Sequence, residues 1–164
     1  MISRNDRFSI IFFTLVVAVV LTLLPMPPML DLMRPYWVAL VVIYWSLETQ
    51  DRISLGMAFT LGLVLDLLSA SLLGLHALSL VIIVYLVARF RARLRFFPPW
   101  QQALSVLALL FNDRIILLWI ISLQGEPLPS LAFWLPPIVG TLLWPWLFLL
   151  LDRYRGVMRH RSSS

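Results

Sequence analysis

The chain has 164 residues, of which 61% are hydrophobic and 13% are charged. A soluble domain is about half apolar and about a quarter charged, and a domain this small cannot bury such an excess in one core. The composition therefore excludes a disordered chain, argues against a soluble enzyme and predicts a membrane protein. The net charge of +5 comes from Arg, since Lys is absent. In a membrane protein such charge indicates topology, and no nucleic-acid partner is expected.

Six apolar segments follow one another along the chain. They cover residues 8–24, 32–47, 53–68, 72–88, 103–123 and 131–151. Because one span needs about 20 residues, we expect a single all-α domain over residues 1–164, a polytopic six-helix transmembrane bundle. A bundle of four spans is the alternative. The third and fourth segments are divided at Ser69-Ala70-Ser71, where small polar residues fit a tight turn.

The second segment is the weakest of the six, because only Pro35 to Leu47 is cleanly apolar. Either Asp31 and Arg34 snorkel at its outer end, or the segment is re-entrant. Tryptophans near the predicted inner ends of the segments are expected at the headgroup level. These residues are Trp45, Trp100, Trp144 and Trp146.

Arginine is distributed unevenly between the two sides of the predicted bundle. If the N-terminus is cytoplasmic, eleven of the 13 Arg lie on the inner side, Arg34 lies outside and Arg114 lies within a span. This positive-inside pattern predicts that both termini are cytoplasmic. The inner basic residues singled out are Arg89, Arg91, Arg93, Arg95, Arg153 and Arg155. They fix topology, contact anionic lipid or form a docking surface for a cytoplasmic protein.

A second set of ionisable residues lies at membrane depth. At a helical rise of about 1.5 Å per residue, four of them fall about 20–21 Å from the inner surface. The set consists of Arg34, Asp66, His76 and Asp113, with Arg114 beside it. Three interpretations remain open. In the first, the residues pair with one another and lock helices together, with Asp66 bound to Arg34, His76 or Arg114. In the second, they line an outer polar pocket for a ligand or for a partner's helix. In the third, they relay protons.

One helix face of the third segment combines Phe59, Gly62, Asp66 and Ser69, which step by three or four residues. A glycine there allows another backbone to approach closely, and packing within the chain is the favoured interpretation. No pattern typical of catalysis, metal binding or cofactor binding is found, so neither enzyme activity nor a cofactor is expected.

Several short strings resemble one family when they are taken together. They are Arg34-Pro35-Tyr36-Trp37-Val38, Gly62-Leu63-Val64-Leu65-Asp66-Leu67-Leu68, Leu73-Gly74, His76-Ala77-Leu78, Trp100-Gln101-Gln102-Ala103-Leu104 and Leu143-Trp144-Pro145-Trp146. Their order over about residues 34–148 resembles the rod shape-determining protein MreD family in its proteobacterial form. In Asn112-Asp113-Arg114 only Asp113 is placed as in that family. Pro35, Trp37, Phe59, Gly62 and Gly74 are then candidates for packing or partner contacts.

The resemblance implies a non-enzymatic scaffold in the bacterial inner membrane that serves cell elongation and lateral peptidoglycan synthesis. Its implied partners are MreC, MreB, RodA and a penicillin-binding transpeptidase, besides membrane lipids. The family is also similar to the six-helix substrate-binding subunits of energy-coupling-factor transporters. That similarity keeps open the alternative of a small-solute-binding or transport subunit with an outer-half polar pocket. A membrane enzyme is a distant third possibility.

Overall fold

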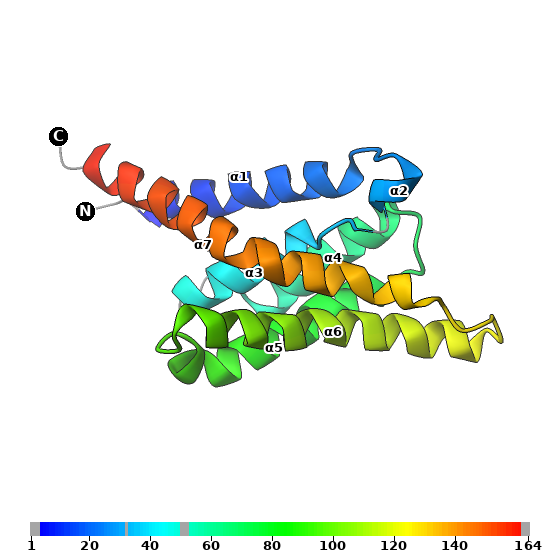
Figure 1. Ribbon diagram of the computed structural model, residues 1–164. Helices are drawn as coiled ribbons and strands as arrows, with labels where there is room; N and C mark the ends of the chain where they lie inside the picture. Colours follow the sequence, from blue (N-terminus) through cyan, green and yellow to red (C-terminus); the bar gives the residue numbers. More distant parts are fainter. Residues whose placement is uncertain (1–3, 32, 50–52, 162–164) are drawn as a thin grey trace.

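The computed structural model describes residues 4–31, 33–49 and 53–161, and all regular structure in this part of the chain is helical. The elements are α1 (Arg4–Leu23), α2 (Pro28–Asp31), α3 (Trp37–Glu48), α4 (Leu55–Leu68), α5 (Leu75–Leu94), α6 (Pro99–Leu123), the 3-10 turn η1 (Leu131–Trp134) and α7 (Leu135–Arg161). The prediction of an all-α protein is confirmed for these residues. The long helices form a bundle, and α1 begins at the end of it where α7 finishes (Figure 1).

Helix length separates the elements into two groups. Three helical segments, Leu75–Leu94, Pro99–Leu123 and Leu131–Gly156, are long and apolar enough to cross a membrane. The other apolar helical stretches, Phe8–Leu23, Trp37–Glu48 and Leu55–Leu68, have between 10 and 17 residues. The long helices fit a membrane protein, as the composition predicts.

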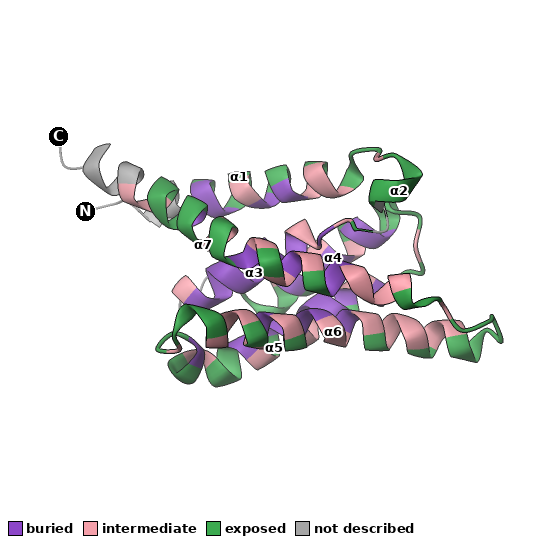
Figure 2. Cartoon of the chain, viewed as in Figure 1, coloured by how far each residue is buried: buried purple, intermediate pink, exposed green. Residues whose placement is uncertain are grey.

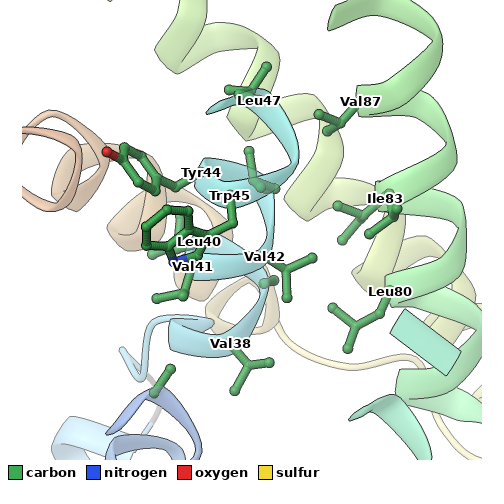
Figure 3. Packing of buried hydrophobic residues seen from close by; sticks show 14 of the residues in the cluster. Val38, Leu40, Val41, Val42, Tyr44, Trp45, Leu47, Leu80, Ile83 and Val87 are labelled. Carbon is green, nitrogen blue, oxygen red and sulfur yellow. The ribbon is translucent and has the colours of Figure 1, made fainter. Parts of the chain in front are cut away.

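Helix α3 lies at the centre of the bundle, and every residue from Val38 to Leu47 is buried. It contacts α1, α5, α6 and α7. A helix that is apolar on all sides is stable only when other elements enclose it, and α3 is the most continuously buried helix in Figure 2. In Figure 3, Val42 of α3 faces Leu80 and Ile83 of α5. The weakest of the six apolar segments is therefore the core of the protein.

Helix α3 also begins later than the sequence predicts. The expected start, Leu32, lies outside the described residues, and the helix begins at Trp37. Pro35 explains why the helix does not extend back through Arg34, because the residue before a proline is disfavoured in the helical conformation. Tyr36, with a ψ of 73°, precedes the first helical residue. The 12 residues of α3 span about 18 Å at the usual rise, which is well short of a bilayer core of about 30 Å.

Two of the four tryptophans expected at the headgroup level lie in the core instead. Trp45 is 3% exposed and Trp144 is 1% exposed. Each indole finds a partner on a neighbouring helix: Trp45 Nε1 donates to Thr14 Oγ1 at 2.9 Å, and Trp144 Nε1 donates to Gln102 Oε1 at 3.2 Å. These hydrogen bonds satisfy the two indole N–H groups in the core, where an unpaired donor would be unfavourable. The predicted headgroup position is therefore wrong for both tryptophans. Trp100 and Trp146 are exposed.

The remaining boundaries differ from the predicted ones mainly at the end of the bundle that the sequence predicts to be cytoplasmic. Helix α5 continues past residue 88 to Leu94, and α6 begins at Pro99 rather than at residue 103. Helix α7 reaches Arg161, while the first residues of the sixth segment form η1. Pro136 and Pro137 lie in the first turn of α7, where a missing N–H costs no helical hydrogen bond.

Helices α4 and α5 form a tight hairpin whose turn lies where the sequence places it. Ala70 has a φ of 49°, and Gly74, which precedes α5, has a φ of 101° that favours glycine. On α4, a Cβ added to Gly62 would lie 2.2 Å from Ala77 Cα and 2.4 Å from Ala77 N. The two backbones therefore touch at Gly62.

We predict that Gly62→Ala separates α4 from α5 and lowers the free energy of unfolding by about 1–3 kcal/mol, because the new methyl group meets backbone that cannot move aside. Unfolding by SDS in mixed micelles measures the change. Gly56→Ala is the matched control in the same helix, since the nearest atom to its added Cβ is 3.8 Å away. It should leave stability unchanged or raise it by up to about 1 kcal/mol. Equal effects of the two substitutions would contradict the close contact.

Candidate functional site

Asp66, in the last turn of α4, receives hydrogen bonds from the start of α5. Its side chain is buried, at 1% exposure for the residue. The Gly74 N–H donates to Oδ2 at 2.8 Å, the His76 N–H donates to Oδ1 at 3.0 Å, and the Ala77 N–H lies 3.5 Å from Oδ2. The first N–H groups of a helix have no partner within the helix and carry its positive dipole end. The Asp66 carboxylate supplies hydrogen-bond acceptors and a negative charge to that end of α5.

Two side chains complete the surroundings of Asp66. Ser71 Oγ donates to Oδ1 at 2.9 Å, and His76 Nδ1 lies 2.8 Å from the same oxygen. The Asp66–His76 pair thus joins the two arms of the α4–α5 hairpin across its turn. Among the three partners that the sequence allows for Asp66, the structure places His76 beside it.

Arg34 has a similar role at a different helix end. Its Nη1 donates to the Thr22 carbonyl and its Nη2 to the Leu24 carbonyl, both at 2.8 Å. These carbonyls lie at the C-terminal end of α1, where the last C=O groups have no helical donors and the dipole is negative. Arg34 therefore ties the segment before α3 back to α1.

Asp113 and Arg114 lie side by side on α6. The Arg114 guanidinium carbon is 4.5 Å from the Phe133 ring centroid and 5.1 Å from that of Tyr36. Such cation–π contacts favour a partly buried arginine. Asp113 is buried, at 9% exposure. Sequence analysis missed the two rings, because Tyr36 and Phe133 are distant from Arg114 along the chain.

The predicted polar layer is therefore divided into three groups rather than gathered around one cavity. Arg34 lies at the end of α1, Asp66 and His76 lie at the start of α5, and Asp113 and Arg114 lie on α6 among aromatic rings. The candidate packing residues are scattered around these groups. Pro35 and Gly62 are buried, Trp37 and Gly74 are half-buried, and Phe59 is exposed.

Of the six basic residues predicted on the inner side, Arg91 and Arg155 are directed toward α3. Arg91 Nε donates to the Ser46 carbonyl at 2.8 Å, and its Nη2 donates to the Ser46 and Thr49 carbonyls. Arg91 thus covers the C-terminal end of α3. The signal for this inward direction was present, because Val87, Arg91 and Leu94 follow the helical spacing of the buried stripe. The alternation of Arg with apolar residues concealed it.

Arg155 also turns toward α3, and it forms ion pairs with Glu48 and Asp152. The C-terminal ends of α3, α5 and α7 therefore meet at one end of the bundle. Arg89, Arg93, Arg95 and Arg153 are exposed there. Four of the six predicted basic residues remain available to lipid headgroups or to another protein.

The contacts described above join one helix to another. No group of three or more His, Cys, Asp or Glu that could hold a metal ion lies within the described ranges. The guanidinium groups of Arg34 and Arg91 and the carboxylate of Asp66 are directed at helix ends. The guanidinium of Arg114 is directed at aromatic rings.

Comparison with known proteins assigns the chain to a family. The model for the rod shape-determining protein MreD matches residues 3–154. The chain belongs to the MreD family. A rod shape-determining protein MreD of Haemophilus influenzae is 36% identical over 159 residues, which cover 92% of this chain and 96% of that protein. No solved structure matches the chain. The resemblance seen in the sequence is confirmed, and this MreD family member is a membrane protein with a role in determining rod shape.

We predict measurable coupling between Asp66 and His76 in this MreD family member. A double-mutant cycle of Asp66→Ala and His76→Ala should give an interaction free energy of about 0.5–3 kcal/mol, because the two side chains are in contact. The matched cycle of Asp66→Ala and Arg34→Ala should add within about 0.5 kcal/mol, since the hydrogen bonds of Asp66 and Arg34 go to different helix ends. Unfolding in mixed micelles provides the four stabilities for each cycle. A larger coupling to Arg34 than to His76 would contradict the assignment.

We also predict that Arg91→Gln lowers the thermal midpoint of the purified protein by about 4–8 °C. Removing the guanidinium takes charged donors from carbonyls at the end of α3, a loss of about 2 kcal/mol. Arg93→Gln, two residues away and exposed, should shift the midpoint by less than about 2 °C. Tryptophan fluorescence in detergent records both values. Equal shifts would show that Arg91 acts as a surface charge.

Proposed function

We propose that this protein is a non-enzymatic scaffold of the cell-elongation machinery, which assembles partners in the plane of the bacterial inner membrane. Its partners would be MreC, MreB, RodA and a penicillin-binding transpeptidase, the set that the family resemblance implies. Membership of the MreD family supports the rod-shape role. The geometry supports a scaffold, because Arg34 and Asp66 contact helix ends and Arg114 contacts neighbouring rings.

One observation has the greatest weight in this proposal. Asp66 receives all its hydrogen bonds from residues 71–77 of its own hairpin. A carboxylate that is fully used in this way is poorly suited to binding a solute or passing on a proton. The residue that most favours a transport function in the sequence is thus a structural one.

The proposed topology has six spans with both termini in the cytoplasm. The exposed Arg89, Arg93, Arg95 and Arg153 lie at the end where α5 and α7 finish, which supports placing that end inside. Helices α3 and α4 are short for a bilayer, but α3 is enclosed by other helices and needs no lipid face of its own. The exposed arginines would face anionic lipid or MreB.

The alternative, a small-solute-binding or transport subunit, is supported less well. It depends on an outer-half polar pocket, whereas the groove between α1 and α7 is lined almost entirely by apolar side chains. A polar solute would leave its hydrogen-bonding groups unpaired there. We therefore place the scaffold first.

Purification from mildly solubilised membranes tests the proposal, and we expect MreC, RodA and the transpeptidase to be recovered with the tagged chain. Depletion of the chain should convert rods into round cells, and re-expression should restore the rods. Recovery of no elongation partner, together with restored shape, would contradict the scaffold. A thermal-shift panel of vitamins and cell-wall precursors tests the alternative, because a ligand at 100 times its Kd stabilises by about 2.7 kcal/mol. Saturable stabilisation by one solute would favour the transport subunit.

A further inference from the structure

An apolar groove of about 690 Å³ runs between α1 and α7, with α3 as its floor. Phe13 to Leu21 form one wall, Leu143 to Tyr154 form the other, and Trp37 and Val41 lie at the base. Figure 1 shows α1 and α7 diverging from the end of the bundle where both of them have their chain termini. The lining residues Phe13, Trp146 and Leu150 are exposed, so the groove opens to the surface of the bundle, where membrane lipid would surround a protein of this family.

The length of the groove corresponds to one leaflet. From Phe13 to Leu21 the helix rises about 12 Å, and from Leu143 to Tyr154 it rises about 17 Å. Half of a bilayer core of about 30 Å is about 15 Å. A transmembrane helix of another protein would cross twice that depth and extend beyond both walls. The acyl chains of a single phospholipid would fit within them.

The two ends of the groove differ in charge. Arg153 is the only charged residue among those that line the groove, and it is exposed beside Tyr154 at the C-terminal end. An arginine there can bind a lipid phosphate, and tyrosine favours the level of the headgroups. The other end, near Leu21, Trp37 and Leu143, is apolar. This difference between the two ends matches a lipid whose headgroup lies at the Arg153 end and whose acyl chains extend toward the apolar end.

We propose that the groove binds one acidic phospholipid, with its acyl chains between α1 and α7 and its phosphate at Arg153. With both termini in the cytoplasm, as the proposed function has it, this lipid belongs to the cytoplasmic leaflet. The opposite topology would place the same lipid in the other leaflet and would leave the site itself unchanged. The bound lipid would fill the space that separates α1 from α7 and hold the two helices at a fixed distance.

Native mass spectrometry of the detergent-purified protein, titrated with phosphatidylglycerol or phosphatidylethanolamine, tests the site. We expect one tightly bound phosphatidylglycerol. Val17→Trp fills the groove and should weaken binding about tenfold, the equivalent of about two buried methylene groups. Val20→Trp is the matched control, because Val20 is an exposed valine of the same helix that does not line the groove. Equal lipid binding by both variants would overturn the proposal.

Charge is tested in the same titration. Arg153→Gln should weaken phosphatidylglycerol about fivefold more than phosphatidylethanolamine, since one arginine near a membrane contributes about 1 kcal/mol to binding an anionic lipid. Arg93→Gln, also exposed at this end, should change neither affinity. Equal losses for Arg153→Gln and Arg93→Gln would show that binding is not localised at the groove.

A photo-crosslinking residue at position 17 identifies the occupant even if Val17→Trp fails to fold. In the purified protein, a lipid adduct at position 17 and none at position 20 supports the proposal. A protein adduct formed at position 17 in membranes would show that a partner helix takes the groove, and would overturn it. Loss of partner recovery in the purification experiment would contradict the scaffold alone, so the two proposals can fail separately.

Discussion

The end of a helix inside a bilayer has N–H or C=O groups that neither water nor lipid can satisfy. Three such ends in this protein receive a charged side chain from another segment. Arg34 serves the end of α1, Arg91 the end of α3 and Asp66 the start of α5. In each case the sign of the charge opposes the helix dipole at that end. This requirement explains the placement of these three charged side chains.

Much of the architecture could be predicted from the sequence, because the chain is divided into apolar segments that are long enough to form helices. The positions of the six main helices and the turn at Ser69–Ser71 follow from hydropathy and small polar residues. The boundaries near Arg91 could not be found in this way. Hydropathy treats an arginine as the end of a buried helix, whereas Arg91 lies on the buried stripe and binds carbonyls of α3.

The candidate site was harder to predict than the fold. Helical rise gives the depth of Arg34, Asp66, His76 and Asp113, but it does not give the direction in which each faces around the bundle. Only the contact between Asp66 and His76 could be predicted from the sequence, because a short turn brings these two residues together. The contacts of Arg114 with Tyr36 and Phe133 join segments whose arrangement no single-sequence pattern specifies.

The enclosure of α3 has a consequence for the way the protein is made. The chain is synthesised from the N-terminus, so α3 emerges well before most of the helices that surround it. The guanidinium that satisfies Ser46 is 45 residues further along the chain, in α5. Until Arg91 has been synthesised, the central helix lacks a donor for its last carbonyls and has no complete set of neighbours. The core of this protein is therefore completed late in synthesis, when α5, α6 and α7 pack around α3.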